Sequence, residues 1–119
     1  MPRYNEDAEQ AVVFSWAEYY PTLRWMHHIP NGGYRKPAEA ARLKKQGVKP
    51  GVSDIFLPLA MGRFHGLYIE MKRRKKDGGS RVSSDQRAFA QAMIMQDFKC
   101  VICYGADEAI AVIKEYANI

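Results

Sequence analysis

The feature that most constrains this chain is a short hairpin near its middle. Two apolar runs, residues 55–59 and 67–71, flank a connection that contains two glycines, and this pattern is typical of two antiparallel strands. Glu70 and Lys72 lie two positions apart at the end of the second run. Because side chains alternate along a strand, both face the same side of the sheet. The hairpin therefore brings a carboxylate and an ammonium together on one face.

A third charged residue, Asp54, opens the first strand of the hairpin. Burying an isolated carboxylate is costly, and the group would normally neutralise instead. Two carboxylates and an ammonium on one patch make sense if a divalent cation binds there, since Asp and Glu oxygens are ligands that Mg²⁺ prefers. Lys72 would then act beside the ion on a water or an oxyanion. The alternative is an ion pair between Glu70 and Lys72 on a solvated strand face, and Asp54 ahead of the first run argues against it.

The pattern Asp…Glu-x-Lys resembles the signature of the PD-(D/E)xK nuclease superfamily, and the chain resembles one branch of it, the VRR-NUC family. The segments that carry the resemblance run from residue 6 to about residue 104: Glu6 with Gln10, Pro30-Asn31-Gly32, Gly47 to Asp54, Ile69-Glu70-Met71-Lys72, and Ser83 with Gln86. One position departs from the family pattern, because Ser53 stands where a proline usually precedes the aspartate. Ser53 shapes the turn and is not a ligand, so the departure leaves the expected chemistry intact.

The resemblance implies a set of site residues. These are Asp54, Glu70, Lys72 and Gln86 for catalysis, and Glu6, Asp54, Glu70 and the backbone carbonyl of Met71 for one or two Mg²⁺ or Mn²⁺ ions. Glu9 remains an alternative to Glu6, because acidic residues in the first turn of a helix also complement the helix dipole. Gln86 has a structural role as well, since Ser83 and Gln86 have the spacing of a capping box.

Length and charge limit the class of protein further. The chain has 119 residues, which suit a single domain over residues 1–119. With 18 Lys and Arg against 13 Asp and Glu, the net charge of +5 suits a polyanionic partner such as DNA. No segment resembles a signal peptide or a membrane span, so we expect a protein of the bacterial cytoplasm, or of the host cytoplasm if phage-encoded. Cys100 and Cys103 would face opposite sides of a strand, which favours free buried thiols.

The remaining elements surround the hairpin. We expect a helix over residues 5–20 with Val12 and Trp16 on its core side, a strand over 23–29, a helix over 37–46, a helix from Ser83 to about Gln96, a buried strand over 99–104 and a last helix capped by Asp107. The order αβαββαβα predicts an α/β fold, a restriction-endonuclease-like mixed sheet flanked by helices.

Two basic segments are candidates for contact with nucleic acid. Asn31 and Arg35 belong to a turn that could touch a phosphate or sugar, and a solvated turn is the alternative. The run Arg73, Arg74, Lys75 and Lys76 follows Lys72 directly, which favours binding of the scissile strand over a solvated loop. The adjacent histidines His27 and His28 do not support a ββα-metal nuclease, because they would point to opposite faces of a strand.

These observations predict a metal-dependent DNA endonuclease that hydrolyses phosphodiester bonds. The resemblance to stand-alone family members implies a homodimer that acts on branched DNA such as four-way (Holliday) junctions. Trp16, Tyr19 and Tyr20 are candidates for the dimer patch, with core burial as the alternative. A nucleic-acid-binding domain without catalysis is a second hypothesis, and a sugar- or RNA-directed enzyme on the same fold is a third.

Overall fold

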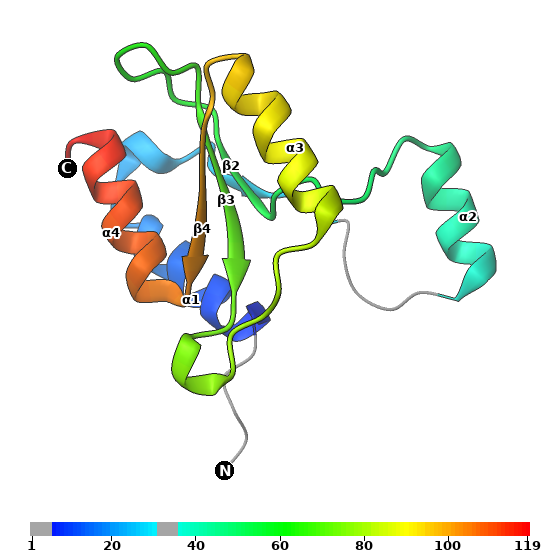
Figure 1. Cartoon of the computed structure of the whole chain (residues 1–119). Coiled ribbons are helices and arrows are strands. Elements are labelled where there is room, and N and C mark those ends of the chain that lie inside the picture. The colour runs from blue at the N-terminus through cyan, green and yellow to red at the C-terminus, as the bar shows by residue number, and fades with distance from the viewer. Residues whose placement is uncertain (1–5, 31–35) are drawn as a thin grey trace.

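The computed structural model describes residues 6–30 and 36–119. Its elements are α1 Glu6–Ala17, β1 His27–His28, α2 Pro37–Lys45, β2 Ile55–Leu57, β3 Leu67–Lys72, α3 Ser84–Met95, β4 Lys99–Tyr104 and α4 Ala106–Ala117, with 3-10 turns at Pro21–Leu23 and Lys75–Asp77. The αβαββαβα order and the mixed sheet confirm the predicted α/β fold (Figure 1).

The sheet has four strands in the order β1-β2-β3-β4. β2 pairs antiparallel with β3, with Ile55 opposite Ile69, so the predicted hairpin is confirmed. β4 pairs parallel with β3 on its other side, after the crossover through α3. β3 is therefore an inner strand, and β4 lies at the edge of the sheet instead of being the buried strand expected over 99–104; Cys103 is its one fully buried residue.

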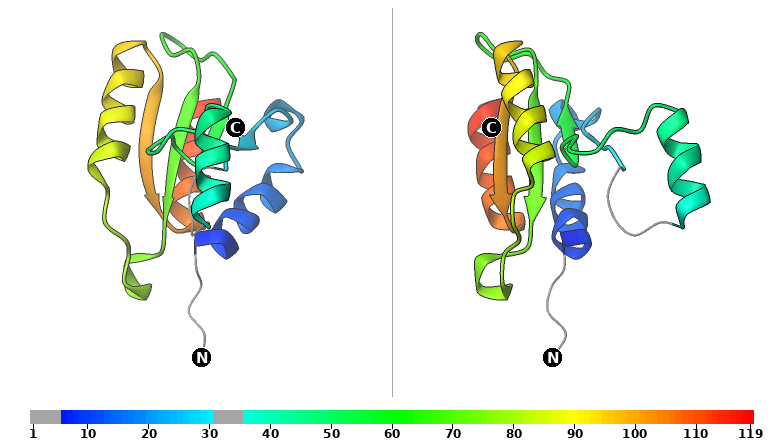
Figure 2. Two further views of the ribbon diagram at one scale, coloured as in Figure 1. Left: turned by 90° about the vertical axis from the view of Figure 1, so that its right-hand side faces the viewer. Right: turned by 45° about the vertical axis from the view of Figure 1, so that its right-hand side comes forward.

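The two faces of the sheet differ in how they are covered. α1 and α4 pack on one face, over a core whose strand residues are Ile55, Leu57, Leu67, Ile69 and Met71. α3 packs against β4 on the other side. Viewed from the side of α2, where the sheet is seen face-on, α4 lies behind the strands and α3 lies beside β4 (Figure 2). The other view in Figure 2 shows that α2 stands away from the sheet. No residue of α2 is buried.

Several local expectations need correction. The core stripe of α1 consists of Glu9, Val13 and Ala17, whereas Val12 is 43% exposed. The strand expected over 23–29 is reduced to His27–His28. A 3-10 turn over Pro21–Leu23 includes the first residue of the expected strand, so the extended segment begins later. The N-cap of α4 is Gly105 and not Asp107, which lies in the first turn of the helix.

Other predicted boundaries are confirmed. Gly47 follows α2 with φ of +100°, the left-handed conformation that ends a helix. Ser83 and Gln86 form both hydrogen bonds of a capping box at the start of α3. Among residues 6–30 and 36–119, no helix is long and apolar enough to cross a membrane.

Candidate active site

The C-terminal half of β3 carries the charged centre of the molecule. Glu70 and Lys72 are 7% and 4% exposed, although each bears an ionisable group. Both lie on the face of the sheet opposite the aliphatic core, as the alternation of side chains predicted. A buried carboxylate and ammonium in an inner strand require nearby partners, because the sheet itself offers them none.

Asp54 precedes β2 and lies opposite Glu70, one step beyond the pair Ile55 and Ile69. Its Oδ2 accepts a hydrogen bond of 2.7 Å from the backbone N–H of Met71. Its own carbonyl oxygen accepts from the backbone N–H of Ile29 at 2.7 Å and from His28 Nδ1 at 2.8 Å. Contacts with both neighbouring strands therefore fix the position of Asp54, and they place its carboxylate beside Glu70.

The Met71 carbonyl also faces this side. The N–H and C=O groups of one strand residue point to the same side of the strand, and the Met71 N–H points at Asp54. β2 begins at Ile55, so it does not extend far enough to pair with Met71. The carboxylates of Asp54 and Glu70 and the carbonyl of Met71 thus lie together at the N-terminal end of β2.

Gln86 links the charged groups to α3. Its Nε2 donates to Glu70 Oε2 at 3.1 Å, while its Oε1 accepts from Lys72 Nζ at 2.9 Å. The same Oε1 accepts from the backbone N–H of Ser83 at 2.9 Å, and the backbone N–H of Gln86 donates to Ser83 Oγ at 3.1 Å. The capping box that begins α3 therefore also orients the amide between Glu70 and Lys72.

The ammonium of Lys72 has two firm acceptors. Besides Gln86, it donates to the backbone carbonyl of Arg81 at 3.0 Å, and it lies 4.0 Å from Glu70 Oε2. An ammonium has three N–H donors. The third donor has no hydrogen bond to a described residue beyond the ion pair with Glu70.

The pKa of Glu70 is raised to about 9, chiefly by burial and next by a hydrogen bond with Asp54 and the Asp54 charge. The charge of Lys72 lowers this pKa, and that of Glu6 adds a smaller increase. When both carboxylates are ionised, neither can donate, and Glu70 Oε1 is then buried without a hydrogen-bond partner among the described residues. When Glu70 is protonated, it can donate to Asp54. The pair therefore needs either a shared proton or a cation.

A divalent cation fits these donors. The unpartnered Glu70 Oε1, the Asp54 carboxylate and the Met71 carbonyl are hard oxygen ligands of the kind that Mg²⁺ and Mn²⁺ take. Within the described part of the chain, no three side chains of His, Cys, Asp and Glu form a ready-made metal cluster. Backbone, water and substrate oxygens would have to complete the coordination, as is usual for Mg²⁺.

The two acidic residues considered in the first helix take different places. Glu6 accepts a hydrogen bond of 2.7 Å from Ser80 Oγ, and its charge acts on Glu70. Glu9 is buried and forms an ion pair of 3.1 Å with Arg74 Nε. Of the two, Glu6 is the one whose charge acts on Glu70, whereas Glu9 neutralises the guanidinium of Arg74.

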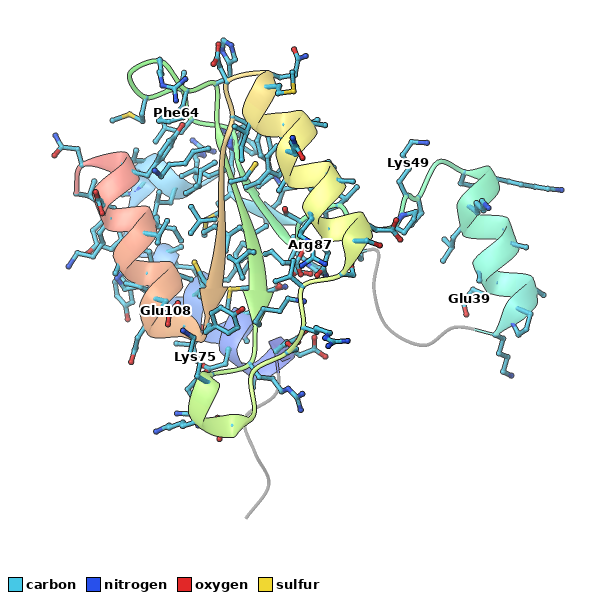
Figure 3. All side chains as sticks on the ribbon, viewed as in Figure 1. Glu39, Lys49, Phe64, Lys75, Arg87 and Glu108 are labelled. Atoms are coloured by element: carbon cyan, nitrogen blue, oxygen red, sulfur yellow. The ribbon has the colours of Figure 1, made fainter. Side chains whose placement is uncertain are left out.

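The basic run after β3 is more ordered than a flexible loop. Arg74 pairs with both Glu9 and Asp77, and Arg73 Nε donates to the Gly79 carbonyl at 3.0 Å. Lys75 stands over the ring of Tyr104 at 5.0 Å and lies near the start of α4, where Glu108 is (Figure 3). Asn31 and Arg35, the other expected nucleic-acid contacts, lie outside the described residues.

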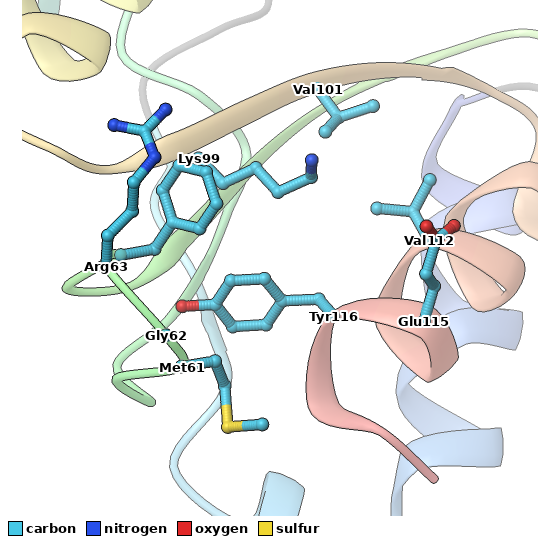
Figure 4. A pocket seen from close by; sticks show the side chains of 9 residues that line it. Met61, Gly62, Arg63, Lys99, Val101, Val112, Glu115 and Tyr116 are labelled. Atoms are coloured by element: carbon cyan, nitrogen blue, oxygen red, sulfur yellow. The ribbon is translucent and has the colours of Figure 1, made fainter.

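Two cavities differ in their relation to this centre. One of about 430 Å³ lies between the sheet and α3, and its lining includes Glu70, Gln86 and Cys100. The other, of about 500 Å³, lies near the start of β4, where Lys99, Glu115 and Tyr116 line it (Figure 4). None of the predicted catalytic residues lines the second cavity, so the first is the one connected with the site.

The two cysteines are free and face opposite sides of β4, as predicted. Burial raises the pKa of Cys100 to about 11 and that of Cys103 to about 12, so both are thiols at neutral pH. This agrees with structural cysteines and not with metal ligands or nucleophiles.

Sequence reasoning missed three partners in the site. The Arg81 carbonyl is a backbone group, which residue identity does not reveal. Ser80 and Glu6 are far apart in the sequence, so their hydrogen bond has no local signal. Tyr68 lies on the same face as Glu70, and strand alternation could have found it.

A mixed α/β sheet with paired carboxylates and a lysine at the end of one inner strand defines the class: a nuclease-like domain with the Asp…Glu-x-Lys constellation. The chain belongs to the VRR-NUC domain family, whose family model matches residues 4–107. A solved VRR_NUC domain protein is similar in fold with a TM-score of 0.84 and 30% sequence identity, over 99% of this chain and 92% of the other. Curated proteins gave no significant match.

Proposed function

We propose that this domain is a metal-dependent DNA endonuclease that hydrolyses phosphodiester bonds. The observation that carries the proposal is the buried, unpartnered Glu70 Oε1 beside the Asp54 carboxylate. Such a pair is electrostatically unfavourable unless a proton or a cation lies between its members. Membership in a nuclease family supports the cation.

We assign a separate role to each residue of the site. Asp54, Glu70 and the Met71 carbonyl would hold Mg²⁺ or Mn²⁺, with Glu6 contributing negative charge. Bound ions of this kind polarise a phosphate and lower the pKa of a bound water. Lys72, oriented by Gln86 and the Arg81 carbonyl, would direct its remaining N–H at the attacking water or at a phosphate oxygen.

The direct test is cleavage of linear, flapped and four-way DNA in Mg²⁺ or Mn²⁺. We expect Lys72→Met to lower cleavage by about 100-fold or more while leaving most of the DNA affinity, because the donor acts on charge that develops in the transition state. Asp54→Asn should do the same and also weaken binding of the metal ion. Lys114→Met, at an exposed position of α4, is the matched control. Full cleavage by either site variant would overturn the assignment.

A nucleic-acid-binding domain without catalysis is the alternative. The carboxylate pair argues against it, since phosphate binding alone gains nothing from buried negative charge. Binding of DNA with no cleavage of any of the three substrates, under conditions where isothermal titration shows bound Mn²⁺, would favour this alternative.

We further propose that two copies act together on branched DNA. One chain offers one such site in its described part, so a single encounter cuts one strand. A four-way junction has twofold symmetry, and a C₂ dimer would present two sites to opposed strands. Tyr19 is 83% exposed and is available for such a contact. Trp16 and Tyr20 pack against each other, with ring centroids 5.0 Å apart, and against the core.

Light scattering and a junction assay test this part separately. We expect a dimer at tens of micromolar protein and paired incisions in a four-way junction. A monomer under these conditions, or incisions in flaps but never in pairs at junctions, would contradict the dimer while leaving the nuclease assignment intact.

A further inference from the structure

The face of the sheet that carries Glu70 is lined by aromatic rings. His27 on β1, Phe56 on β2 and Tyr68 on β3 are paired across the strands, so their side chains lie on one face. The opposite face carries fully buried aliphatic side chains, whereas Phe56 and Tyr68 are only half-buried and His27 is exposed. Phe89 on α3 covers part of this face, because its ring meets that of Tyr68 edge-on with centroids 5.1 Å apart. The rest of the rings keep surface in water, and a continuous group of partly exposed rings is typical of a binding surface.

The rings form a continuous row. The rings of Phe56 and Tyr68 stack with centroids 4.4 Å apart. The rings of His27 and Phe56 pack edge to face with centroids 5.9 Å apart. Phe98, just before β4, extends the row at 5.5 Å from Tyr68. A Cβ on Gly66 would come within 2.8 Å of the Phe56 ring, so this glycine lets the ring lie against the backbone. We call Phe56, Tyr68 and Phe98 the aromatic face.

The aromatic face adjoins the candidate active site along both strands of the hairpin. Tyr68 precedes Glu70 by two residues and Phe56 follows Asp54 by two, so each ring shares a side of its strand with a carboxylate. Two residues of a strand span about 6.6 Å. A nucleotide held by its phosphate at the carboxylates would therefore have a neighbouring nucleotide within reach of the rings.

We propose that the aromatic face stacks bases next to the scissile phosphate that are unpaired, as in a flap, or that open at a branch point when the DNA is bound. This inference rests on the proposed nuclease function. Aromatic side chains bind single strands by stacking, independently of sequence, because every base presents a π-face. The bases of an intact duplex are already stacked on one another and cannot use these rings. Continuity with the carboxylates favours DNA over a second protein chain as the occupant.

The test compares DNA binding by variants in the Lys72→Met background, which prevents cleavage. Phe56→Leu and Tyr68→Leu remove the ring while keeping apolar volume, and Phe64→Leu removes a ring that lines the second cavity, away from this face, as the matched control. Fluorescence anisotropy would measure the affinity for a flapped DNA and for a blunt duplex. We expect each site variant to lose about five- to 150-fold in affinity for the flap. Affinity for the duplex should not change, and Phe64→Leu should match its parent on both.

A second measurement leaves the protein unaltered, in case a variant folds poorly. Flaps with abasic sites at successive positions next to the branch are bound by the parent protein. We expect a loss of similar size at one or two positions, and no additional loss when the same flaps meet Phe56→Leu. Equal affinity for normal and abasic flaps would overturn the proposal. So would a loss of dimerisation in light scattering with unchanged flap affinity, which would assign the face to a second copy.

The two proposals fail in different ways. If no DNA is cleaved but base-dependent binding persists, the nuclease function fails and the aromatic face stands. If cleavage depends on Lys72 but is the same for normal and abasic flaps, the nuclease function stands and the aromatic face has no role in substrate choice.

Discussion

Replacing Glu70 by Gln should stabilise the metal-free protein at alkaline pH, although it removes a central residue of the proposed site. Gln has nearly the same shape as protonated Glu. Its amide can donate to Asp54, where Glu70 can donate only when protonated, and its oxygen can still accept from Gln86. The substitution therefore keeps a neutral hydrogen-bond donor at position 70 at every pH.

The magnitude follows from the pKa of Glu70, which is about 9 in the folded protein against an ordinary value of 4.5. Between these values the folded state holds a proton that the unfolded state has released. Stability is thus fully present below pH 4.5 and declines as the pH rises to about 9, by at most about 1.4 kcal/mol per pH unit. At pH 8 the loss reaches up to about 5 kcal/mol, a large part of the stability of an ordinary domain.

Urea denaturation in EDTA at pH 5 and pH 8 would measure this. We expect the parent protein to lose several kcal/mol between the two conditions, while Glu70→Gln loses little, so that the variant is the more stable protein at pH 8. Glu18→Gln, at an exposed carboxylate, should follow the parent. Added Mn²⁺ should stabilise the parent at pH 8 and not the Glu70→Gln variant. Equal pH dependence in the parent and Glu70→Gln would refute the strained carboxylate pair.

Three further predictions concern the surroundings of the site. Ser83→Ala should cost about 1 kcal/mol of unfolding free energy through the lost helix cap, and it should also slow cleavage, because Gln86 loses a support; urea unfolding and a cleavage assay check both. Gly51→Ala should destabilise far more than Gly62→Ala in thermal unfolding. Both glycines have positive φ, but only a Cβ on Gly51 meets backbone atoms, at 2.3 Å from a carbonyl oxygen, while nothing lies within 4 Å of one on Gly62. Lys76→Ser should reduce the slope of log affinity against log salt by roughly 0.9 if this lysine contacts a DNA phosphate, and an unchanged slope would make it a solvated side chain.

The sequence predicted those parts of the site that depend on local periodicity. Alternation along β3 placed Glu70 and Lys72 on one face, and the spacing of Ser83 and Gln86 predicted the capping box. Turn residues placed the hairpin and the end of α2. Each of these features is decided by neighbours within a few residues, which is why pattern and propensity were sufficient.

Features decided by distant partners were not predictable. The core stripe of α1 was placed wrongly because it includes Glu9, whose charge argues against burial. Glu9 is buried only because Arg74, 65 positions later in the chain, pairs with it at 3.1 Å. The strand expected over 23–29 was too long for a different reason, since a short 3-10 turn at Pro21–Leu23 places Leu23 in the core. Hydrophobicity alone does not distinguish the two conformations.

The connection between the site and the fold runs through the first turn of α3. Gln86 closes the cap of that helix and also bridges Glu70 and Lys72, so any change that loosens the helix start also releases the ammonium. Gly51 packs directly against the backbone of Asp85, next to Gln86, and it precedes Asp54 by three residues. The loop before β2 and the start of α3 are therefore packed against each other, and one carries Asp54 while the other carries Gln86, both of which contact the Glu70 strand. We expect substitutions in either segment to affect metal binding and the orientation of Lys72 together, even where they touch neither group.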